Sequence, residues 1–434
     1  MKYKILIFLS ILCCQKGIEC SAQISQSSLD SLDMYLNQKN YKEYYLHISS
    51  ICKTIASSPR SSKAIQQLKK YIELELDLRT QENKNYYRHA LMHYGKRIAI
   101  DQGDYQTALK FYLVANKLVE DPFCLDSMGW FIEHSIATIY HRFNDYNNAQ
   151  KYYNITLEYL KYHNNPKQIC RLYPELAKLY FETRSIIDAK ECYLEGIKIS
   201  KNISYPYGEF INTLGYCSLE LEFLNNLNNT FLKRLWVLKD QITSEKSYNE
   251  KLSETFRLMS LYELKKLNFK KADSLFSESY CQLLNFYNGN SNRREFAKLF
   301  FNYAKSAFWL ERNYFADSLL NESIKCLLPS STSNLTSIKI NDLYGENTFY
   351  DIFKFKSILL ERKFKTTLDT NDIIQSIDYL ALSLKTNELL RVNINYDESL
   401  LFSISENNYI INRSLGLLNK LQNSKYKFNK AREI

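Results

Sequence analysis

A five-residue pattern that recurs through the middle of the chain constrains the fold more than any other feature. Each copy has a polar residue, then an aromatic ring, then an alanine three residues after the ring. The clearest copies read Asp104-Tyr105-Gln106-Thr107-Ala108, Asp145-Tyr146-Asn147-Asn148-Ala149 and Asn268-Phe269-Lys270-Lys271-Ala272. A second ring follows each alanine by four residues, which is the spacing of one helix face. A fourth copy has Ile186 in place of the first ring, followed by Ala189 and Tyr193.

The spacing of these copies indicates a structural repeat. The alanines Ala108, Ala149, Ala189 and Ala272 are separated by 41, 40 and 83 residues, so the last gap holds two periods. A degenerate copy should then lie near Leu227 and Thr230, and a sixth near Tyr314 and Ala316. A period of 40 to 44 residues is long enough for one pair of helices.

Small residues at two further positions explain how such pairs would pack. Twelve residues before the alanines stand Ala137, Ala177, Ser260 and Ala304, and seven residues after them stand Ala115, Thr156, Gly196 and Ser279. Antiparallel helices approach closely only where side chains are small, so the first set should close each pair and the second should let the next pair stack. The first rings should fill the gap beside the turn. Stacking would bury an apolar face that no single pair covers.

The composition favours helices throughout. The 434 residues include only 10 glycines and 6 prolines, well below the roughly 12% of average usage, which leaves few breakers for hairpins. The 35 tyrosines and 24 phenylalanines fall at helical spacing and are best interpreted as core packing. We therefore predict an all-α chain.

These residues resemble the tetratricopeptide repeat, which places a small residue on its first helix and an aromatic before a small residue on its second. The resemblance covers about 240 residues. It differs from the family in period, since the standard unit has 34 residues. It also differs in its turns, because only Gly103 supplies the expected glycine. The resemblance implies a right-handed α-solenoid of antiparallel helix pairs.

Four segments follow from this pattern. Residues 1–22 are interpreted as a leader, residues 23–85 as an N-terminal helical cap, residues 86–328 as the repeats, and residues 338–434 as a segment of long helices. The cap includes a helix predicted over residues 63–78. Pro329 begins the polar turn that separates the repeats from the last segment.

The last segment carries a second resemblance. Asp378-Tyr379-Leu380-Ala381, Leu389-Leu390-Arg391 and Tyr396-Asp397-Glu398-Ser399 resemble the helical region that precedes the caspase-like domain of CHAT proteins. Those proteins join tetratricopeptide arrays to a cysteine peptidase. The resemblance transfers no catalytic residue to this sequence, because the family's histidine and cysteine would lie downstream.

The first 22 residues predict export. Lys2 and Lys4 precede a short apolar run that is too short to span a bilayer, and Cys20-Ser21-Ala22 suits signal peptidase cleavage before Gln23. Acylation of Cys13 is a second, less favoured interpretation. Export predicts a periplasmic or extracellular protein, with association to the cell envelope as an option. Of the 10 cysteines, seven lie beyond the leader at wide spacings, which favours small buried side chains over disulfide pairs.

No pattern in the sequence predicts catalysis. Phosphate-binding, dinucleotide-binding, nucleophile-elbow and paired-cysteine zinc motifs are all missing from the sequence. His89 and His93 have the four-residue spacing of two zinc ligands, but no glutamate base follows His89 and no third ligand is evident. We expect neither a metal nor a cofactor.

A basic surface is the best candidate for binding. Spacing from the alanines places nine basic side chains on the first-helix face that should line the concave side of the solenoid: His93, Arg97, His134, His141, Arg142, Arg171, Lys178, Arg257 and Lys265. Arginine and lysine there would suit an acidic peptide. An ordinary solvated helix face is the competing interpretation.

Charge and export together limit the partner. The net charge is +10, or about +8 without the leader, which favours anionic partners, while export argues against nucleic acid. A basic C-terminal end, which includes Lys425 and Lys430, allows peripheral contact with a membrane. We predict a non-enzymatic scaffold for a protein or peptide. The alternative is the regulatory array of a CHAT-type peptidase whose catalytic domain is absent from this chain.

Overall fold

The computed structural model describes most of the chain. It covers residues 24–55, 62–74, 80–99, 104–118, 129–222, 249–291, 293–328, 346–391 and 397–423, with single residues between 230 and 240 and between 338 and 343. The leader, Cys124 and most of the degenerate copy around Leu227 lie outside these ranges. All the regular elements in the described ranges are helices, which confirms the predicted fold class.

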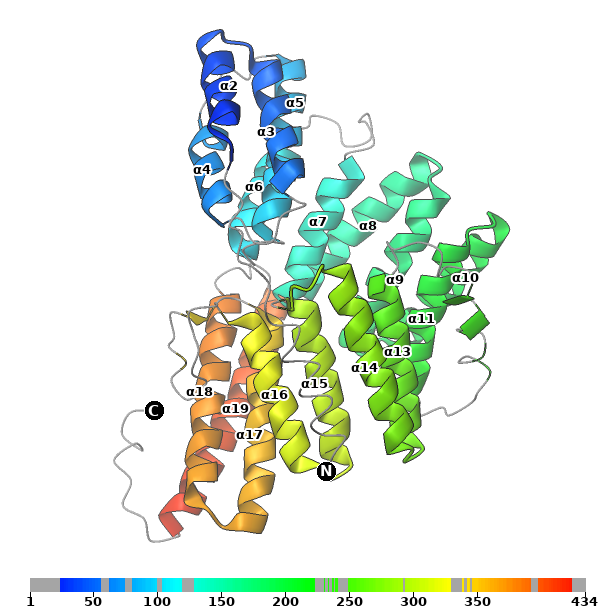
Figure 1. The fold of residues 1–434 in the computed structure, drawn as a ribbon, viewed down its shortest axis with the longest axis vertical. Coiled ribbons are helices and arrows are strands. Elements are labelled where there is room, and N and C mark those ends of the chain that lie inside the picture. The colour runs from blue at the N-terminus through cyan, green and yellow to red at the C-terminus, as the bar shows by residue number, and fades with distance from the viewer. Residues whose placement is uncertain are drawn as a thin grey trace. The chain divides into compact units, whose positions relative to one another are not determined.

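The helices fall into two compact units (Figure 1). Among the described residues, the N-terminal unit contains residues 24–141 and 146–172, and the C-terminal unit contains residues 142–145 and those from 173 onward. The N-terminal unit has α2 (Gln26–Asn37), α3 (Tyr41–Ile55), α4 (Ser62–Ile72), α5 (Gln81–Arg97), α6 (Tyr105–Lys117), α7 (Gly129–Arg142), α8 (Tyr146–Tyr162) and the start of α9 (Pro166–Glu182).

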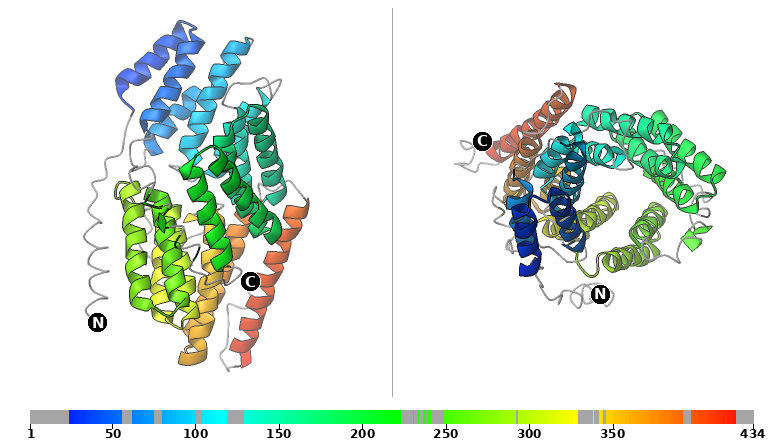
Figure 2. Two further views of the ribbon diagram at one scale, coloured as in Figure 1. Left: turned by 90° about the vertical axis from the view of Figure 1, so that its right-hand side faces the viewer. Right: turned by 90° about the horizontal axis from the view of Figure 1, so that it is seen from above.

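The C-terminal unit continues the array. It holds the rest of α9 and then α10 (Ile186–Asn202), α11 (Pro206–Glu222), α13 (Asn249–Lys265), α14 (Phe269–Phe286), α15 (Arg294–Trp309), α16 (Asn313–Leu327), α17 (Asn347–Thr367), α18 (Thr370–Arg391) and α19 (Asp397–Asn423). Neighbouring helices in the chain pack as antiparallel pairs, and the pairs of this unit follow one another along an arc (Figure 2).

The repeat alanines form the centre of the pairs, as predicted. Ala108, Ala149, Ala189, Ala272 and Ala316 are all fully buried. In the pair of α13 and α14, the hydroxyl of Ser260 donates to the carbonyl of Ala272 at 2.8 Å. The small residues therefore do allow the two helices of a pair to approach closely.

The positions seven residues after the alanines serve two purposes. A Cβ added to Gly196 of α10 would lie 2.1 Å from Oδ1 of Asn212 in α11, so this glycine admits the next helix, as predicted. In α14, however, the hydroxyl of Ser279 donates to the carbonyl of Ser253 in its own pair at 2.7 Å. This serine therefore also joins the two helices of its own pair.

The two sets of rings also differ. The rings four residues after the alanines, such as Tyr112, Tyr153 and Phe276, are buried as predicted. The first ring of the α14 copy, Phe269, is instead 39% exposed. Phe269 is the first residue of its helix and stands at the outer end of the pair, so it does not fill the gap beside the turn.

One turn geometry, which needs no glycine, recurs between the helices. At the end of α9, Arg184 is left-handed with φ 64°, the Ser185 amide donates to the Tyr180 carbonyl, and the Arg184 amide donates to the Phe181 carbonyl. This is the Schellman arrangement that satisfies the last carbonyls of a helix. The ends of α13 and α15 repeat it, with Leu267 and Glu311 as the left-handed residues. These turns are thus closed without glycine.

One helix of the predicted cap is shorter than the sequence suggests. The helix predicted over residues 63–78 ends at Ile72, and residues 75–79 lie outside the described part. Two tyrosine hydroxyls fix α4 against its neighbours, since Tyr44 donates to the Tyr71 carbonyl at 2.8 Å and Tyr94 donates to the Ile65 carbonyl at 3.0 Å.

Candidate functional site

A cluster of charges at the end of α7, on α9 and α15, and at the start of α17 is the most unusual polar feature of the C-terminal unit. We call it the charged cluster and define it by Arg142, Lys178, Arg294, Lys298 and Glu346. Glu346 is the N-cap of α17, and its carboxylate accepts hydrogen bonds from the amide of Thr348 at 3.0 Å and from the Thr348 hydroxyl at 2.7 Å. The cap explains why a carboxylate is held at this place.

Two arginines contact that carboxylate. Nε of Arg294 lies 2.6 Å from Oε1 of Glu346, and a terminal nitrogen of Arg142 lies 3.9 Å from Oε2. The side chain of Glu346 is 1% exposed. Burial alone would raise its pKa, but the fields of Arg294, Arg142 and Lys298 outweigh burial and lower the pKa to about 2. Glu346 is therefore ionised throughout the physiological range.

Lys298 stands beside this pair without a charged partner of its own. It is one turn after Arg294 on α15, is half-buried, and forms no hydrogen bond or ion pair with any residue that the structure describes. Burial lowers the pKa of Lys298 well below its ordinary 10.5, and Arg294, Lys178 and Arg142 lower it further, while Glu346 opposes them. Three cations, Arg142, Arg294 and Lys298, thus act on one buried carboxylate, while Lys178 pairs with Glu182 of its own helix at 3.9 Å.

Further charges continue along the same helix faces. Asp351, one turn into α17, is exposed and lies within the electrostatic range of Lys305, Glu182 and Lys354. Lys354 in turn donates to Glu406 of α19 at 2.5 Å, and the Tyr350 hydroxyl donates to the same carboxylate. The cationic part of the face is therefore bordered by a mixed part in which most charges are paired.

Of the nine basic residues predicted for the concave face, four lie in the C-terminal unit. Arg142 and Lys178 are brought together around Lys298. Arg257 is buried and forms a two-bond ion pair with Glu254, from Nε at 2.8 Å and from a terminal nitrogen at 2.7 Å. Lys265 donates to the carbonyl of Leu221. Lys265 thus joins α13 to α11, whereas the ion pair of Arg257 lies within α13.

The other five lie in the N-terminal unit. Arg97 and His141 are buried, and His141 packs edge-on against Tyr153 with the ring centroids 6.2 Å apart. His134 is half-buried against the same tyrosine, and Arg171 is exposed. His93 lies 4.6 Å from the ring of His89, and its pKa is lowered to about 4, first by burial and then by His89.

The described part of the chain places no third metal ligand beside the histidine pair. His89 is hydrogen-bonded through Nδ1 to the hydroxyl of Ser49 at 3.2 Å, and the described residues contain no group of three His, Cys, Asp or Glu side chains that could hold a metal ion.

Four of the described cysteines have buried thiols, as the sequence predicts: Cys52, Cys170, Cys217 and Cys326. Cys281 is exposed.

The sequence contained a signal for Lys298 that the prediction did not use. Arg171 lies six residues before Ala177 and Lys178 lies one residue after it. The same register applied to Ala304 of the sixth copy selects Lys298 and Lys305. Glu346 had no such signal, because it lies in an aperiodic segment between helices.

Fold and site together define a tetratricopeptide-like α-solenoid with a charged cluster on its first-helix faces. No family model and no curated protein matches the chain. Among solved structures, the apo form of the quorum sensor NprR from B. thuringiensis has 13% identity over 89% of this chain and 99% of that chain, with a TM-score of 0.42. A signal transduction ATPase with a tetratricopeptide repeat sensor from Pyrococcus horikoshii has 15% identity over 88% of this chain and 55% of that chain, with a TM-score of 0.36.

Proposed function

We propose that the chain is an exported scaffold that binds an acidic segment of a protein or peptide at the charged cluster, without catalysis of its own. The observation that carries the proposal is Lys298. Its ammonium group is half-buried among Arg142, Lys178 and Arg294 and has no ion pair within the described residues. A partly buried ammonium group without a counter-ion destabilises the fold, and a bound anion would offset this destabilisation.

A carboxylate ligand fits this arrangement physically. The only anion that the cluster itself supplies, Glu346, is already used by Arg294 and by the start of α17. A second carboxylate placed near Lys298 would relieve the mutual repulsion of the cations and restore the pKa of Lys298 toward its ordinary range. Arg142 and Lys178 could then bind the same ligand from the neighbouring elements.

Export determines where such a partner would be found. The predicted leader, residues 1–22, supports an encounter in the periplasm, at the cell envelope or outside the cell, and argues against nucleic acid. Among the helices that the structure describes, none combines the length and apolar character needed to cross a bilayer.

A second candidate is the recognition array of a CHAT-type peptidase. It is favoured by the resemblance of residues 378–406 and by the helices that carry them, since α18 and α19 have 22 and 27 residues. This candidate keeps the same binding role but requires a catalytic partner. A downstream reading frame that encodes a histidine and a cysteine in an α/β pattern would support it.

Binding of peptides to residues 23–434 tests the main proposal. Isothermal titration would compare glutamate-rich and lysine-rich peptides of equal length, at low and high salt. We expect the acidic peptide alone to bind, more weakly at high salt. The variants Lys298→Glu and Arg142→Glu/Lys178→Glu should each lose this binding.

A matched control uses an exposed lysine on another face. Lys190→Glu changes the same charge on α10, so it should leave the affinity unchanged. Equal affinity for both peptides, or equal losses in Lys190→Glu and Lys298→Glu, would refute the charged cluster as the binding site. A pull-down from the cell envelope with a parallel peptide-cleavage assay would then separate a scaffold from a peptidase subunit.

A further inference from the structure

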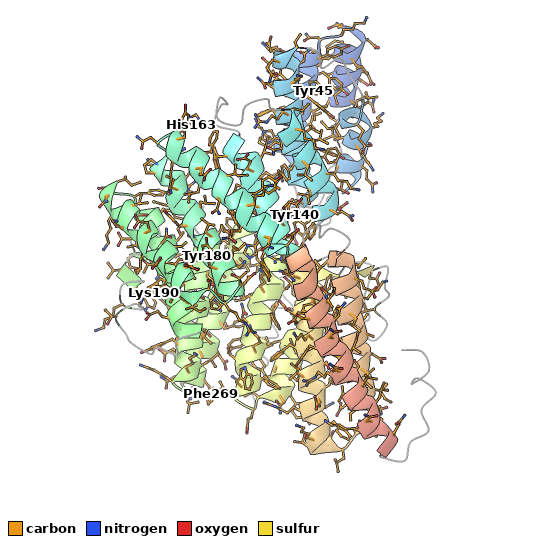
Figure 3. The ribbon with its side chains drawn as sticks, turned by 180° about the vertical axis from the view of Figure 1, so that it is seen from behind. Tyr45, Tyr140, His163, Tyr180, Lys190 and Phe269 are labelled. Atoms are coloured by element: carbon orange, nitrogen blue, oxygen red, sulfur yellow. The ribbon has the colours of Figure 1, made fainter. Side chains whose placement is uncertain are left out.

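Apolar side chains gather at one edge of the C-terminal unit, far from the helix faces that carry the charged cluster. We call this the turn edge and define it by Leu267, Phe269, Trp309, Tyr314 and Leu368. Their side chains are 62%, 39%, 71%, 80% and 74% exposed, respectively. They come from three successive turns, between α13 and α14, α15 and α16, and α17 and α18. All three turns lie at the lower end of Figure 1, and Phe269 marks the same end in Figure 3.

Two arginines join the three turns into one surface. The guanidinium carbon of Arg312 lies 5.7 Å from the ring of Phe269 and 4.5 Å from that of Phe315. The guanidinium carbon of Arg362 lies 3.4 Å from the ring of Phe308 and 5.7 Å from that of Trp309, and a terminal nitrogen of Arg362 donates to the Phe308 carbonyl at 2.7 Å. The edge is therefore continuous from α13 to α17.

The two leucines stand in an unusual backbone conformation. Leu267 and Leu368 have φ of 62° and 56°, in the left-handed region that disfavours branched side chains. The other non-glycine residues described in that region are polar: Lys39, Asn144, Asn164, Arg184, Ser204, Asn288 and Glu311. Only the two residues of the turn edge are apolar. A strained and exposed leucine at the tip of a turn points to a role outside the folded unit.

The charges around the edge favour an anionic surface. Four lysines there are exposed, Lys266, Lys270, Lys271 and Lys365, against two exposed carboxylates, Glu311 and Asp369, and one of the four, Lys271, pairs with the buried Glu263 at 2.5 Å. Lysine can keep its ammonium in water while its aliphatic stem covers apolar surface. Tryptophan and tyrosine combine an apolar body with a polar tip and concentrate at the boundary between lipid and water.

We propose that the turn edge docks on the surface of an anionic lipid bilayer. The tips of three parallel turns present their rings and leucines side by side, so they can enter the headgroup boundary together while the lysines bind anionic lipids. This surface is separate from the charged cluster and does not depend on it. The docked protein would keep the faces of α9, α15 and α17 available for a partner.

Vesicle binding by the whole mature chain tests this. The probes are vesicles of phosphatidylglycerol and phosphatidylcholine in equal parts, and vesicles of phosphatidylcholine alone. In a Trp130→Phe/Trp236→Phe background, Trp309 is the only tryptophan of the sequence. We expect its emission to shift to the blue and to be quenched by brominated lipid only with the anionic vesicles. Absence of both changes would overturn the proposal.

Variants connect the binding to the edge. Trp309→Ala/Leu368→Ser should weaken vesicle binding by about tenfold or more, because two large apolar contacts are lost. Lys266→Glu/Lys270→Glu should weaken it by about fivefold per lysine at low salt. Tyr162→Ala on α8 is the matched control, since Tyr162 is also 71% exposed, and it should leave binding unchanged.

The outcomes separate this proposal from the previous one. Equal losses in Tyr162→Ala and in Trp309→Ala/Leu368→Ser would show that the turn edge is not the docking surface. Vesicle binding that persists in Lys298→Glu, together with loss of acidic-peptide binding, would support both proposals independently. If Trp309 were instead protected only by a soluble envelope protein, with no response to anionic vesicles, the edge would be a protein interface and the lipid proposal would be wrong.

Discussion

Arg294 Nε lies 2.6 Å from Glu346 Oε1, and this pair joins the start of α15 to the start of α17. A terminal nitrogen of Arg294 also donates to Oδ1 of Asn347 at 2.8 Å, and the Asn347 amide donates to Oδ1 of Asn144 at 3.3 Å. The pair therefore belongs to a network that includes Arg142, the last residue of α7, and Asn144, both in the segment 142–145 that belongs to the C-terminal unit.

The first prediction concerns this buried carboxylate. The pKa of Glu346 is lowered from 4.5 to about 2 in the fold, so its contribution to stability is fully present above pH 4.5 and is lost as pH falls toward 2. The shift corresponds to roughly 3 kcal/mol. Glu346→Gln should lower the free energy of unfolding by about that amount at pH 7 in urea titrations. At pH 2 the difference from wild type should nearly vanish.

Glu195→Gln is the control for that measurement, because Glu195 forms only an exposed pair with Lys198 at 3.2 Å. Such a pair contributes about 0 to 1 kcal/mol. A Glu346→Gln variant as stable as Glu195→Gln at pH 7 would show that the ion pair of Glu346 with Arg294 does not stabilise the fold.

Glu133 in the N-terminal unit should respond to pH in the opposite direction. It is 4% exposed, its Oε2 atom has no hydrogen-bond partner among the described residues, and burial raises its pKa to about 7 against the opposing field of Arg88. A raised carboxyl pKa means that stability is fully present below pH 4.5 and is lost as pH rises from 4.5 through 7. At pH 8 the loss should be roughly 3 kcal/mol.

Glu133→Gln should therefore stabilise the protein at pH 8 and have little effect at pH 4.5. Urea unfolding of wild type and variant at both values measures this, and the exposed Glu158 of α8 supplies the control variant Glu158→Gln. A Glu133→Gln variant that loses stability at pH 8 would mean that the ionised carboxylate is needed by Arg88.

Part of the fold and of the candidate site could be predicted from the sequence, and part could not. The helix pairs were predictable because Ala149 and Ala272 recur with one period and must be buried wherever two helices approach. Lys298 could have been predicted, because it has the same position relative to the small residue of its helix as Arg171. The role of Glu346 could not be predicted, because it depends on contacts between residues that are distant in the chain. The exposure of Phe269 could not be predicted either, because it depends on the position of that ring at the end of a helix.

A glycine comparison tests the packing of successive pairs. In Gly196→Ala the new methyl group would lie 2.1 Å from Oδ1 of Asn212. Asn212 is fully buried, and its Nδ2 donates to the Gly208 carbonyl at 2.8 Å. Overpacking of this kind costs about 1 to 3 kcal/mol. Gly416→Ala in α19 meets no atom within 4 Å and should instead stabilise the helix by about 1 kcal/mol. Thermal unfolding of both variants should show shifts of opposite sign, and a shared sign would refute the tight contact between α10 and α11.

The left-handed leucines allow stability to be separated from membrane docking. Leu267→Gly should raise the free energy of unfolding by about 1 kcal/mol, because glycine adopts φ of 62° without steric strain and the exposed side chain contributes little packing. Leu267→Ala keeps the strain and should not stabilise. Both substitutions remove the side chain from the turn edge, so both should weaken binding to anionic vesicles. Urea unfolding and vesicle sedimentation on the same two proteins check this, and a glycine variant that is both more stable and fully competent to bind would show that Leu267 has no part in docking.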